Sequence, residues 1–459
     1  MYIYSLLSLF VNPFLIKEFT PIKSEINKQI NYTIPLFKTN LLTKVNGFYG
    51  QIGPNPMYYN NTDDYHLFDG NGMIQGVFIN NSKITFTNHW VRTEKFEYEK
   101  KTKKKIPIRM DNILKRKNIL LTPFYILLNK LNMFPNYIGT ANTALWQLGN
   151  NFYALHERDN PYQIGINFIN NTIETVNKVN IKGIEYFTAH PKKYKNFTYF
   201  CSYNTFRPVV EIHEINENLE IVNTKLINTK YVNMVHDIVV TNDYIIFIDM
   251  PFQFNINNIF NEKMPFYFDK KFNNSIVLVN RNLLNITTIE CNESFFAFHY
   301  DTSYEDTDNI YINLVMHNDF DLDLSTFKNT TNYSKYRKLV INKKTFNYYF
   351  EKNSYFEDYN LEFPVSNNIY SVLTIFGDKL DMNGFMIIKD FKCKKKHLLF
   401  NRKLYAEPSI TNTNCVICFT YDDKFNNYLY VYDIDSNTDL EIKLDINLIK
   451  GFHSIFIKN

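Results

Sequence analysis

Histidine is the residue type in this chain best suited to bind a transition metal, because a neutral imidazole nitrogen is a common metal ligand. The chain has ten histidines, distributed from residue 66 to residue 453. They form neither a helical HExxH pair nor the closely spaced Cys and His cluster of a zinc finger. A metal site built from several of them needs ligands from segments that are far apart in the sequence.

The cysteines offer a second candidate site. Cys415 and Cys418 have the CxxC spacing of redox and zinc sites, but they lie in the apolar, strand-like run NCVICF. We interpret them as two buried thiols. The chain has five cysteines, an odd number scattered over its length, which argues against a disulfide framework.

The segments that must position these side chains are predominantly β-strands. Short runs of β-branched and aromatic residues recur along the chain, separated by Asn, Asp, Gly and Lys clusters suited to turns. Examples are ITFTNHWV, YIIFIDM, SIVLVN, IYINLVM, YLYVYDI and SIFIKN. So many short strands in 459 residues favour a propeller or a large barrel over a sandwich. No clear internal repeat marks the blade boundaries.

Composition and charge limit the classes of function. Hydrophobic residues make up 45% of the chain, enough for a large core, and aromatic residues make up 17%, which suits an apolar cavity lining. The formal net charge is +4 and the basic residues are mixed with acidic ones, so nucleic-acid binding is not indicated. The start, MYIYSLLSLFVNPFLIKEF, has an apolar stretch too short to cross a bilayer and lacks the basic region of a secretory signal. We therefore expect a cytoplasmic protein.

One segment differs from the strand pattern. Residues 112–135, NILKRKNILLTPFYILLNKLNMFP, combine four basic residues with a run of leucines and aromatic residues. A basic and strongly apolar helix of this kind is typical of a segment that lies in a membrane interface. The alternative is a helix that covers one end of the fold.

Three pieces of a signature occur in order near the N-terminus. They are a Gly-Pro-Asn-Pro turn at 53–56, a Phe-Asp-Gly-x-Gly-Met segment at 68–73 and Trp-Val-Arg-Thr at 90–93. Together they resemble the signature of the carotenoid cleavage oxygenase family. Gly and Pro supply tight turns here and act as scaffold rather than as catalysts. Gln51 and Ile52 depart from the family, which commonly has a basic residue before the turn.

Four histidines occur in contexts that resemble the iron ligands of this family. They are His190 in FTAHPKK, His236 in MVHDIVV, His299 in FFAFHYDTSYED and His453 in GFHSIFI. The resemblance implies that each comes from a different blade and that together they hold Fe(II) on the propeller axis. Four imidazoles on an octahedral metal leave two positions, enough for dioxygen and a water. The remaining histidines have no such match and are interpreted as ordinary core or surface residues: His66, His89, His156, His213, His317 and His397.

The family also implies a set of residues around the iron. Glu157 in ALHERDNPYQI, Glu362 in LEFPVSNN and Glu407 in YAEPSITN match carboxylates that accept the other N–H of a ligand imidazole and offset the charge of the metal. Thr143, in GTANTAL, matches a small side chain that crowds one open position. Phe298, beside His299, is a candidate wall of a substrate tunnel, with simple core packing as the alternative.

The resemblance extends from Gly47 to His453 and implies one domain over residues 1–459, a seven-bladed β-propeller with a loop and helix cap over the metal. The implied activity is cleavage of an alkene bond of a carotenoid or apocarotenoid by dioxygen, with peripheral membrane contact at 112–135. Stilbene cleavage is an alternative on the same site. Retinoid isomerohydrolysis is disfavoured, because IPIRMDNILKRKN stands where the animal branch has Pro-Asp-Pro-Cys. An alternative of another class is an inactive propeller that binds a lipid, but such a protein has no reason to keep this charged constellation.

Overall fold

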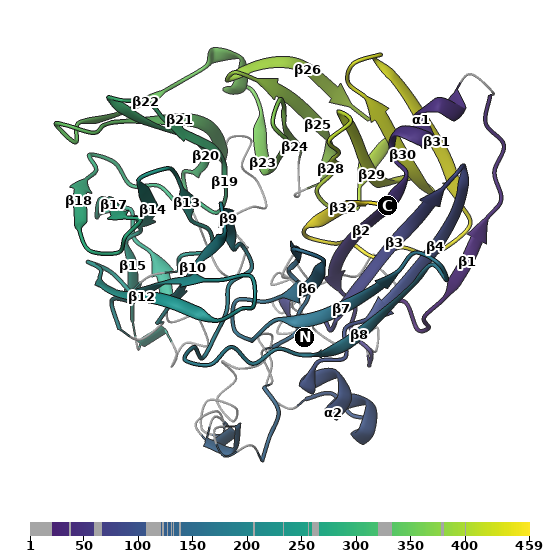
Figure 1. Cartoon of the computed structure of the whole chain (residues 1–459), viewed down its shortest axis with the longest axis horizontal. Helices are drawn as coiled ribbons and strands as arrows, with labels where there is room; N and C mark the ends of the chain where they lie inside the picture. The colour runs from purple at the N-terminus through teal and green to yellow at the C-terminus, as the bar shows by residue number, and fades with distance from the viewer. Residues whose placement is uncertain are drawn as a thin grey trace, which may run out of the picture.

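The computed structural model describes residues 21–459 except 36–37, 59–66, 107–120, 122–123, 126, 130, 132, 137–138, 205–206, 233, 256, 259–265, 320–332, 378–380 and 400. Seven antiparallel sheets of four or five strands follow one another around a centre, in chain order (Figure 1). The predicted seven-bladed β-propeller is confirmed. No helix among the described residues is long and apolar enough to cross a bilayer.

The first blade joins strands from both ends of the described chain. Its strands are β1 (Asn27–Ile30), β2 (Gly47–Pro54), β3 (Gly72–Asn80), β4 (Lys83–Trp90) and β32 (Ser454–Lys458), in the order β1-β4-β3-β2-β32. Strand β32 pairs antiparallel with β2, from Lys458 opposite Gly47 to Ser454 opposite Gln51. The ring is therefore closed by backbone hydrogen bonds between residues 47–51 and residues 454–458, which are far apart in the sequence.

The other six blades each use consecutive strands. The second has β5 (Ala144–Leu148), β6 (Asn151–Leu155), β7 (Tyr162–Asn167) and β8 (Thr172–Lys178). The third has β9 (Lys192–Tyr194), β10 (Phe197–Tyr203), β11 (Val209–Ile215) and β12 (Ile221–Asn228). The fourth has β13 (Val239–Val240), β14 (Tyr244–Asp249), β17 (Ser275–Asn280) and β18 (Ile286–Glu290), with a hairpin of β15 (Phe252–Phe254) and β16 (Phe266–Phe268).

The last three blades complete the ring. The fifth has β19 (Tyr300–Glu305), β20 (Asn309–His317), β21 (Ser334–Asn342) and β22 (Tyr348–Glu351). The sixth has β23 (Asn360–Ser366), β24 (Ser371–Phe376), β25 (Met382–Lys389) and β26 (Lys392–Leu398). The seventh has β27 (Arg402–Leu404), β28 (Ser409–Ile410), β29 (Cys415–Asp422), β30 (Asn427–Asp433) and β31 (Thr438–Leu444). Two helices lie wholly within the described residues, α1 (Thr39–Lys44) and α2 (Glu94–Thr102), together with the 3-10 turns η2 (Leu67–Asp69) and η4 (Ser354–Phe356).

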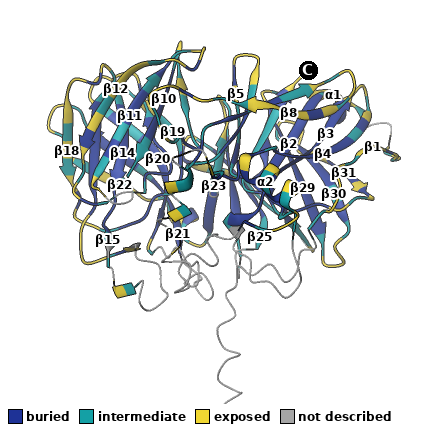
Figure 2. Cartoon of the chain, turned by 90° about the horizontal axis from the view of Figure 1, so that it is seen from below, coloured by how far each residue is buried: buried dark blue, intermediate teal, exposed yellow. Residues whose placement is uncertain are grey.

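Apolar packing between neighbouring blades makes the core. Successive side chains of a strand point to opposite faces of its sheet, so Phe48 of β2 packs toward the second blade while Tyr49 packs toward the seventh. Both faces of middle strands such as β17, β20 and β29 are covered, and buried residues fill the blades while exposed ones gather at turns and outer edges (Figure 2). This burial explains why these middle strands read as nearly continuous apolar runs.

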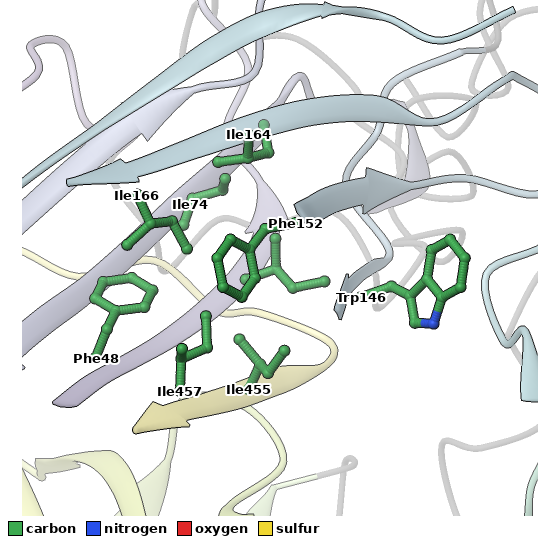
Figure 3. A pocket seen from close by; sticks show the side chains of 9 residues that line it. Phe48, Ile74, Trp146, Phe152, Ile164, Ile166, Ile455 and Ile457 are labelled. Carbon is green, nitrogen blue, oxygen red and sulfur yellow. The ribbon is translucent and has the colours of Figure 1, made fainter. Parts of the chain in front are cut away.

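A small pocket marks the seam between the first and second blades. Side chains of β2, β3 and β32 face side chains of β5, β6 and β7 across it (Figure 3). Its lining is wholly apolar: Phe48, Ile74, Leu145, Trp146, Phe152, Ile164, Ile166, Ile455 and Ile457. None of the predicted site residues lines it, and we assign it to blade packing.

The signature near the N-terminus positions backbone. A Cβ on Gly53 would lie 2.4 Å from the carbonyl oxygen of Lys450, so only glycine lets the segment before β32 cross β2 this closely. Trp90 is buried and donates from Nε1 to the carbonyl oxygen of Asn55 at 3.0 Å. Thr93 caps α2 by accepting a hydrogen bond from the backbone N–H of Phe96 at 3.1 Å. These motifs therefore hold the first blade in shape.

The cysteine prediction is confirmed. Cys415 and Cys418 lie buried on β29, and all five cysteines are free. Burial raises the pKa of Cys415 to about 11 and raises that of Cys418 further, as expected for inert thiols.

Candidate metal centre

Four strands that face the centre of the ring position the four predicted histidines. His190 lies two residues before β9, His236 three residues before β13, and His299 and His453 directly before β19 and β32. Each of these strands is the edge of its sheet nearest the middle of the ring (Figure 1). Four blades therefore each contribute one imidazole at the same level of the axis.

The four imidazoles form one compact cluster. One nitrogen from each of His190, His236, His299 and His453 lies within 4.8 Å of all the others. The rings of His190 and His236, and those of His190 and His453, have centroids 4.5 Å apart. Nε2 of His236 and Nε2 of His299 are 3.2 Å apart. Among the described residues this is the one cluster of metal-ligating side chains found.

Three of these rings are held from outside by the predicted glutamates. Nδ1 of His236 contacts Oε1 of Glu157. Nδ1 of His299 lies 2.6 Å from Oε2 of Glu362. Nδ1 of His453 lies 2.9 Å from Oε2 of Glu407. All three contacts use Nδ1, so in each ring Nε2 remains available toward the centre.

The hydrogen bonds decide the tautomers and test whether a metal fits. A carboxylate only accepts, so each of the three rings donates its Nδ1 proton and keeps a lone pair on Nε2. The Nε2 atoms of His236 and His299 lie 3.2 Å apart, and two lone pairs at this distance repel each other unless a positive charge, either a proton or a metal ion, lies between them. Nε2 of His190 is buried with no hydrogen-bond partner in the described part of the chain. The residues present therefore fit a transition-metal ion that prefers imidazole.

The pKa shifts of the buried groups also favour a bound cation. Burial alone would raise the pKa of Glu157, but the charge and hydrogen bond of His236 outweigh it and lower that pKa to about 2. Burial also opposes ionisation of Glu362, yet His299 and His317 lower its pKa well below the usual range. Burial lowers the pKa of His190 well below 6.5 and so keeps that ring neutral. Buried carboxylates beside these imidazoles supply negative charge that makes the centre suitable for a divalent cation.

The second oxygen of each carboxylate also has a donor. Oε2 of Glu157 accepts from the hydroxyl of Tyr203 at 2.9 Å, and Oε1 of Glu407 accepts from the backbone N–H of Ser454 at 2.8 Å. Oε1 of Glu362 lies 2.8 Å from Nε2 of His317. The interpretation of His317 as an ordinary core or surface residue missed this contact. Only the pairing of β20 with the segment before β19 brings it to this place, and no motif marks it.

Phe298 and Thr143 lie in different surroundings. The ring of Phe298 packs edge-on against His236 at 5.1 Å and stacks on His299 at 5.8 Å. Thr143 lies just before β5, and its hydroxyl donates to Oδ1 of Asn142 at 3.2 Å. The structure thus brings Phe298 against the cluster, whereas the hydroxyl of Thr143 bonds to Asn142.

The other histidines lie elsewhere. His66 is outside the described residues. Each of the others has a hydrogen-bond partner away from the four-histidine cluster: His89 with Thr175, His156 with the backbone of Arg158, His213 with Ser202 and Thr224, and His397 with Tyr430. These four fit their interpretation as ordinary residues.

Known proteins resemble this chain in sequence and in fold. A family model described as retinal pigment epithelial membrane protein matches residues 30–373. Carotenoid 9,10(9′,10′)-cleavage dioxygenase 1 of Pisum sativum is 27% identical over 303 residues, which are 64% of this chain and 55% of that protein. The match thus spans little more than half the length of that relative.

Two solved structures show the likeness of fold. Lignostilbene dioxygenase of Pseudomonas brassicacearum has a TM-score of 0.76 at 15% identity, over 96% of this chain and 97% of that chain. Cobalt-substituted apocarotenoid oxygenase of Synechocystis has a TM-score of 0.75 at 15% identity, over 98% of this chain and 99% of that chain.

Proposed function

Because this chain belongs to the family of retinal pigment epithelial membrane protein and the carotenoid cleavage oxygenases, we propose that it is a non-haem iron(II) dioxygenase that cleaves an alkene bond of a carotenoid or apocarotenoid. The observation that carries the proposal is the cluster of four imidazoles, three of them hydrogen-bonded to buried carboxylates. A relative that accepts cobalt supports a site for a divalent transition metal.

The chemistry that bound iron(II) supplies is activation of dioxygen for insertion across a C=C bond, which yields two carbonyl products. This overall reaction neither releases nor takes up a proton. The four histidines hold the metal and the glutamates hold the rings. Phe298 covers the rings of His236 and His299 with an apolar surface that excludes water and suits a polyene.

The substrate class is tested with a panel. Iron-loaded protein should convert carotenoids or apocarotenoids into aldehydes or ketones, with oxygen from labelled dioxygen in the products. Mass spectrometry of those products identifies the bond that is cleaved. Conversion of stilbenes alone would transfer the proposal to that substrate class. An iron-loaded protein that binds polyenes and cleaves neither class would favour the lipid-binding alternative.

The outer carboxylates give a further expected result. Replacing Glu407 by Gln keeps a hydrogen-bond acceptor for His453 but removes a buried negative charge. Iron affinity should fall by about 10- to 100-fold, the usual cost of losing such a partner. Competition with a calibrated chelator measures it. Glu214→Gln is the control, because Glu214 accepts from Tyr199 on the outer part of the third blade. Equal affinities in the two variants would remove the proposed role of Glu407.

We also propose that the segment at 112–135 contacts a membrane and so delivers the substrate without passage through water. Most of this segment lies outside the described residues. In its described part, Leu121, Phe124 and Leu127 are 44%, 54% and 53% exposed. The neighbouring Tyr125 packs instead against Phe134, with ring centroids 4.7 Å apart. One side of the segment is thus anchored and the other presents apolar side chains.

Replacing Leu121, Phe124 and Leu127 together by Ser should reduce co-sedimentation with phosphatidylcholine and phosphatidylserine vesicles and leave iron content unchanged. Each CH₂ removed from the interface costs about 0.8 kcal/mol of binding free energy. Val222, Leu226 and Leu284 are exposed to a similar degree on the third and fourth blades, and their replacement by Ser is the control. If both triple variants sediment like the parent protein, the segment is a cap and not a membrane contact.

A further inference from the structure

Among the described residues, His317 is the one histidine outside the four-histidine cluster whose imidazole is hydrogen-bonded to a glutamate of the metal centre. It is the last residue of β20 and is 3% exposed. Its backbone pairs with that of Phe296, with hydrogen bonds of 2.9 and 2.7 Å in the two directions. This bridge places the His317 side chain beside the segment that carries His299.

The hydrogen bonds around His317 fix its tautomer. Nε2 lies 2.8 Å from Oε1 of Glu362, while Nδ1 is buried and has no hydrogen-bond partner in the described part of the chain. A proton on Nδ1 would leave a buried N–H unpaired and would set the Nε2 lone pair against a carboxylate lone pair. The proton therefore sits on Nε2 and is donated to Glu362.

Glu362 consequently joins two imidazoles. Oε2 accepts from Nδ1 of His299 at 2.6 Å and Oε1 accepts from Nε2 of His317 at 2.8 Å. Oε2 also accepts from the backbone N–H of Phe363. The carboxylate is thus held at both oxygens, which stops it from rotating away from His299.

Aromatic rings fix the donor itself. The ring of Tyr333 stacks on His317 with centroids 6.1 Å apart, and Phe298 packs edge-on at 5.9 Å. A donor enclosed in this way loses little conformational entropy when it bonds Glu362. Phe298 also contacts His236 and His299, so the same rings connect His317 to the metal centre.

We propose that His317 is a positioning residue for the metal centre, which orients Glu362 and through it the ligand imidazole of His299. This inference rests on the proposed metal-binding function of the four histidines but not on the identity of the substrate. The pairing of two histidines on one carboxylate restrains the centre at the fifth blade more than a single hydrogen bond would.

Three variants separate positioning from general packing. His317→Phe keeps a ring in the aromatic enclosure but removes the donor, and His317→Gln restores a donor near the position of Nε2. His213→Phe is the matched control, because His213 is similarly buried and bonds the hydroxyls of Ser202 and Thr224, which belong to the third blade and not to the metal centre. Fe(II) and Co(II) affinities are measured by chelator competition, together with the visible absorption spectrum of the Co(II) form.

We expect His317→Phe to lower metal affinity by about 10-fold and to shift the Co(II) bands, as loss of an outer partner does. His317→Gln should recover most of the affinity, and His213→Phe should change neither readout. Metal affinity in His317→Phe equal to that of His213→Phe would overturn the proposal.

A double-mutant cycle tests whether His317 acts through Glu362. The variant with both His317→Phe and Glu362→Ala should bind metal about as well as Glu362→Ala alone, because without the carboxylate His317 has no side chain to orient. Multiplicative losses would overturn the proposal. Metal binding without cleavage of any polyene would contradict the proposed activity and leave this inference standing. Failure of the parent protein to bind metal would overturn both.

Discussion

Replacing His236 or His299 by Ala should abolish both iron binding and alkene cleavage. Each removes one of four imidazole ligands and also leaves a buried carboxylate, Glu157 or Glu362, without its partner. A buried charge that loses its partner costs several kcal/mol, so each substitution should also destabilise the folded protein. Protein purified without oxygen should contain close to one iron per chain, and each variant should contain almost none. Elemental analysis measures the metal, and product formation from an apocarotenoid measures the activity.

His213→Ala controls for the loss of a buried histidine, because His213 bonds the hydroxyls of Ser202 and Thr224 outside the metal centre. That variant should lose stability while keeping its iron. A variant with all four ligand histidines replaced by Ala that still held a full equivalent of iron would show that the metal binds elsewhere.

Replacing Gly53 by Ala should damage the fold and the metal centre together. The added Cβ would lie 2.4 Å from the carbonyl oxygen of Lys450 and 2.6 Å from Cα of Gly451, both backbone atoms with little freedom to move. The free energy of unfolding should fall by about 2–4 kcal/mol, at the upper end for overpacking. His453 follows the displaced segment, and its carbonyl oxygen accepts from the N–H of Ile52 at 3.1 Å. Iron affinity should therefore fall as well.

Gly149→Asn provides the control for this second prediction. Gly149 lies in the turn between β5 and β6 with φ of +58°, no atom lies within 4 Å of its added Cβ, and Asn tolerates this conformation. Urea unfolding and chelator competition are measured on both variants. Normal iron affinity in a destabilised Gly53→Ala protein would show that the crossing at Gly53 does not position His453.

The propeller could be predicted from the sequence because the composition of the strands and the contexts of the four histidines indicate the same fold. The run CVICFTYD, which forms β29, is rich in apolar, β-branched and aromatic residues because both faces of this strand are buried. The spacing of His190, His236, His299 and His453 has a simple physical origin, since each lies just before an inner strand of a different blade. Local contexts around these residues were sufficient to identify them without any knowledge of distance.

The role of His317 and the blade boundaries depend on strand register, which cannot be recognised from local patterns in a single sequence. His317 reaches Glu362 only because β20 pairs with the segment at Phe296, and a shift by one residue would turn its ring to the opposite face. The blade boundaries were also inaccessible, because the first blade takes β32 from far along the chain. The second oxygen of each glutamate accepts a hydrogen bond from a different type of donor: a tyrosine hydroxyl, a histidine N–H and a backbone N–H. These donors share no sequence motif, so they could not be predicted.

The strand that closes the ring is preceded directly by His453, one of the four proposed metal ligands, so metal bound at this site would couple ring closure to metal occupancy. When β32 separates from β2, His453 leaves the centre and at most three imidazoles remain. Metal bound by the closed form alone favours closure by RT ln(1 + [M]/Kd), or about 2.7 kcal/mol at a free metal concentration 100 times Kd. The bound ion would then stabilise the pairing of β32 with β2 and so the closed form of the propeller. Amide hydrogen exchange along β2 and β32 should slow when metal is added, while exchange in the outer strands of distant blades should change little.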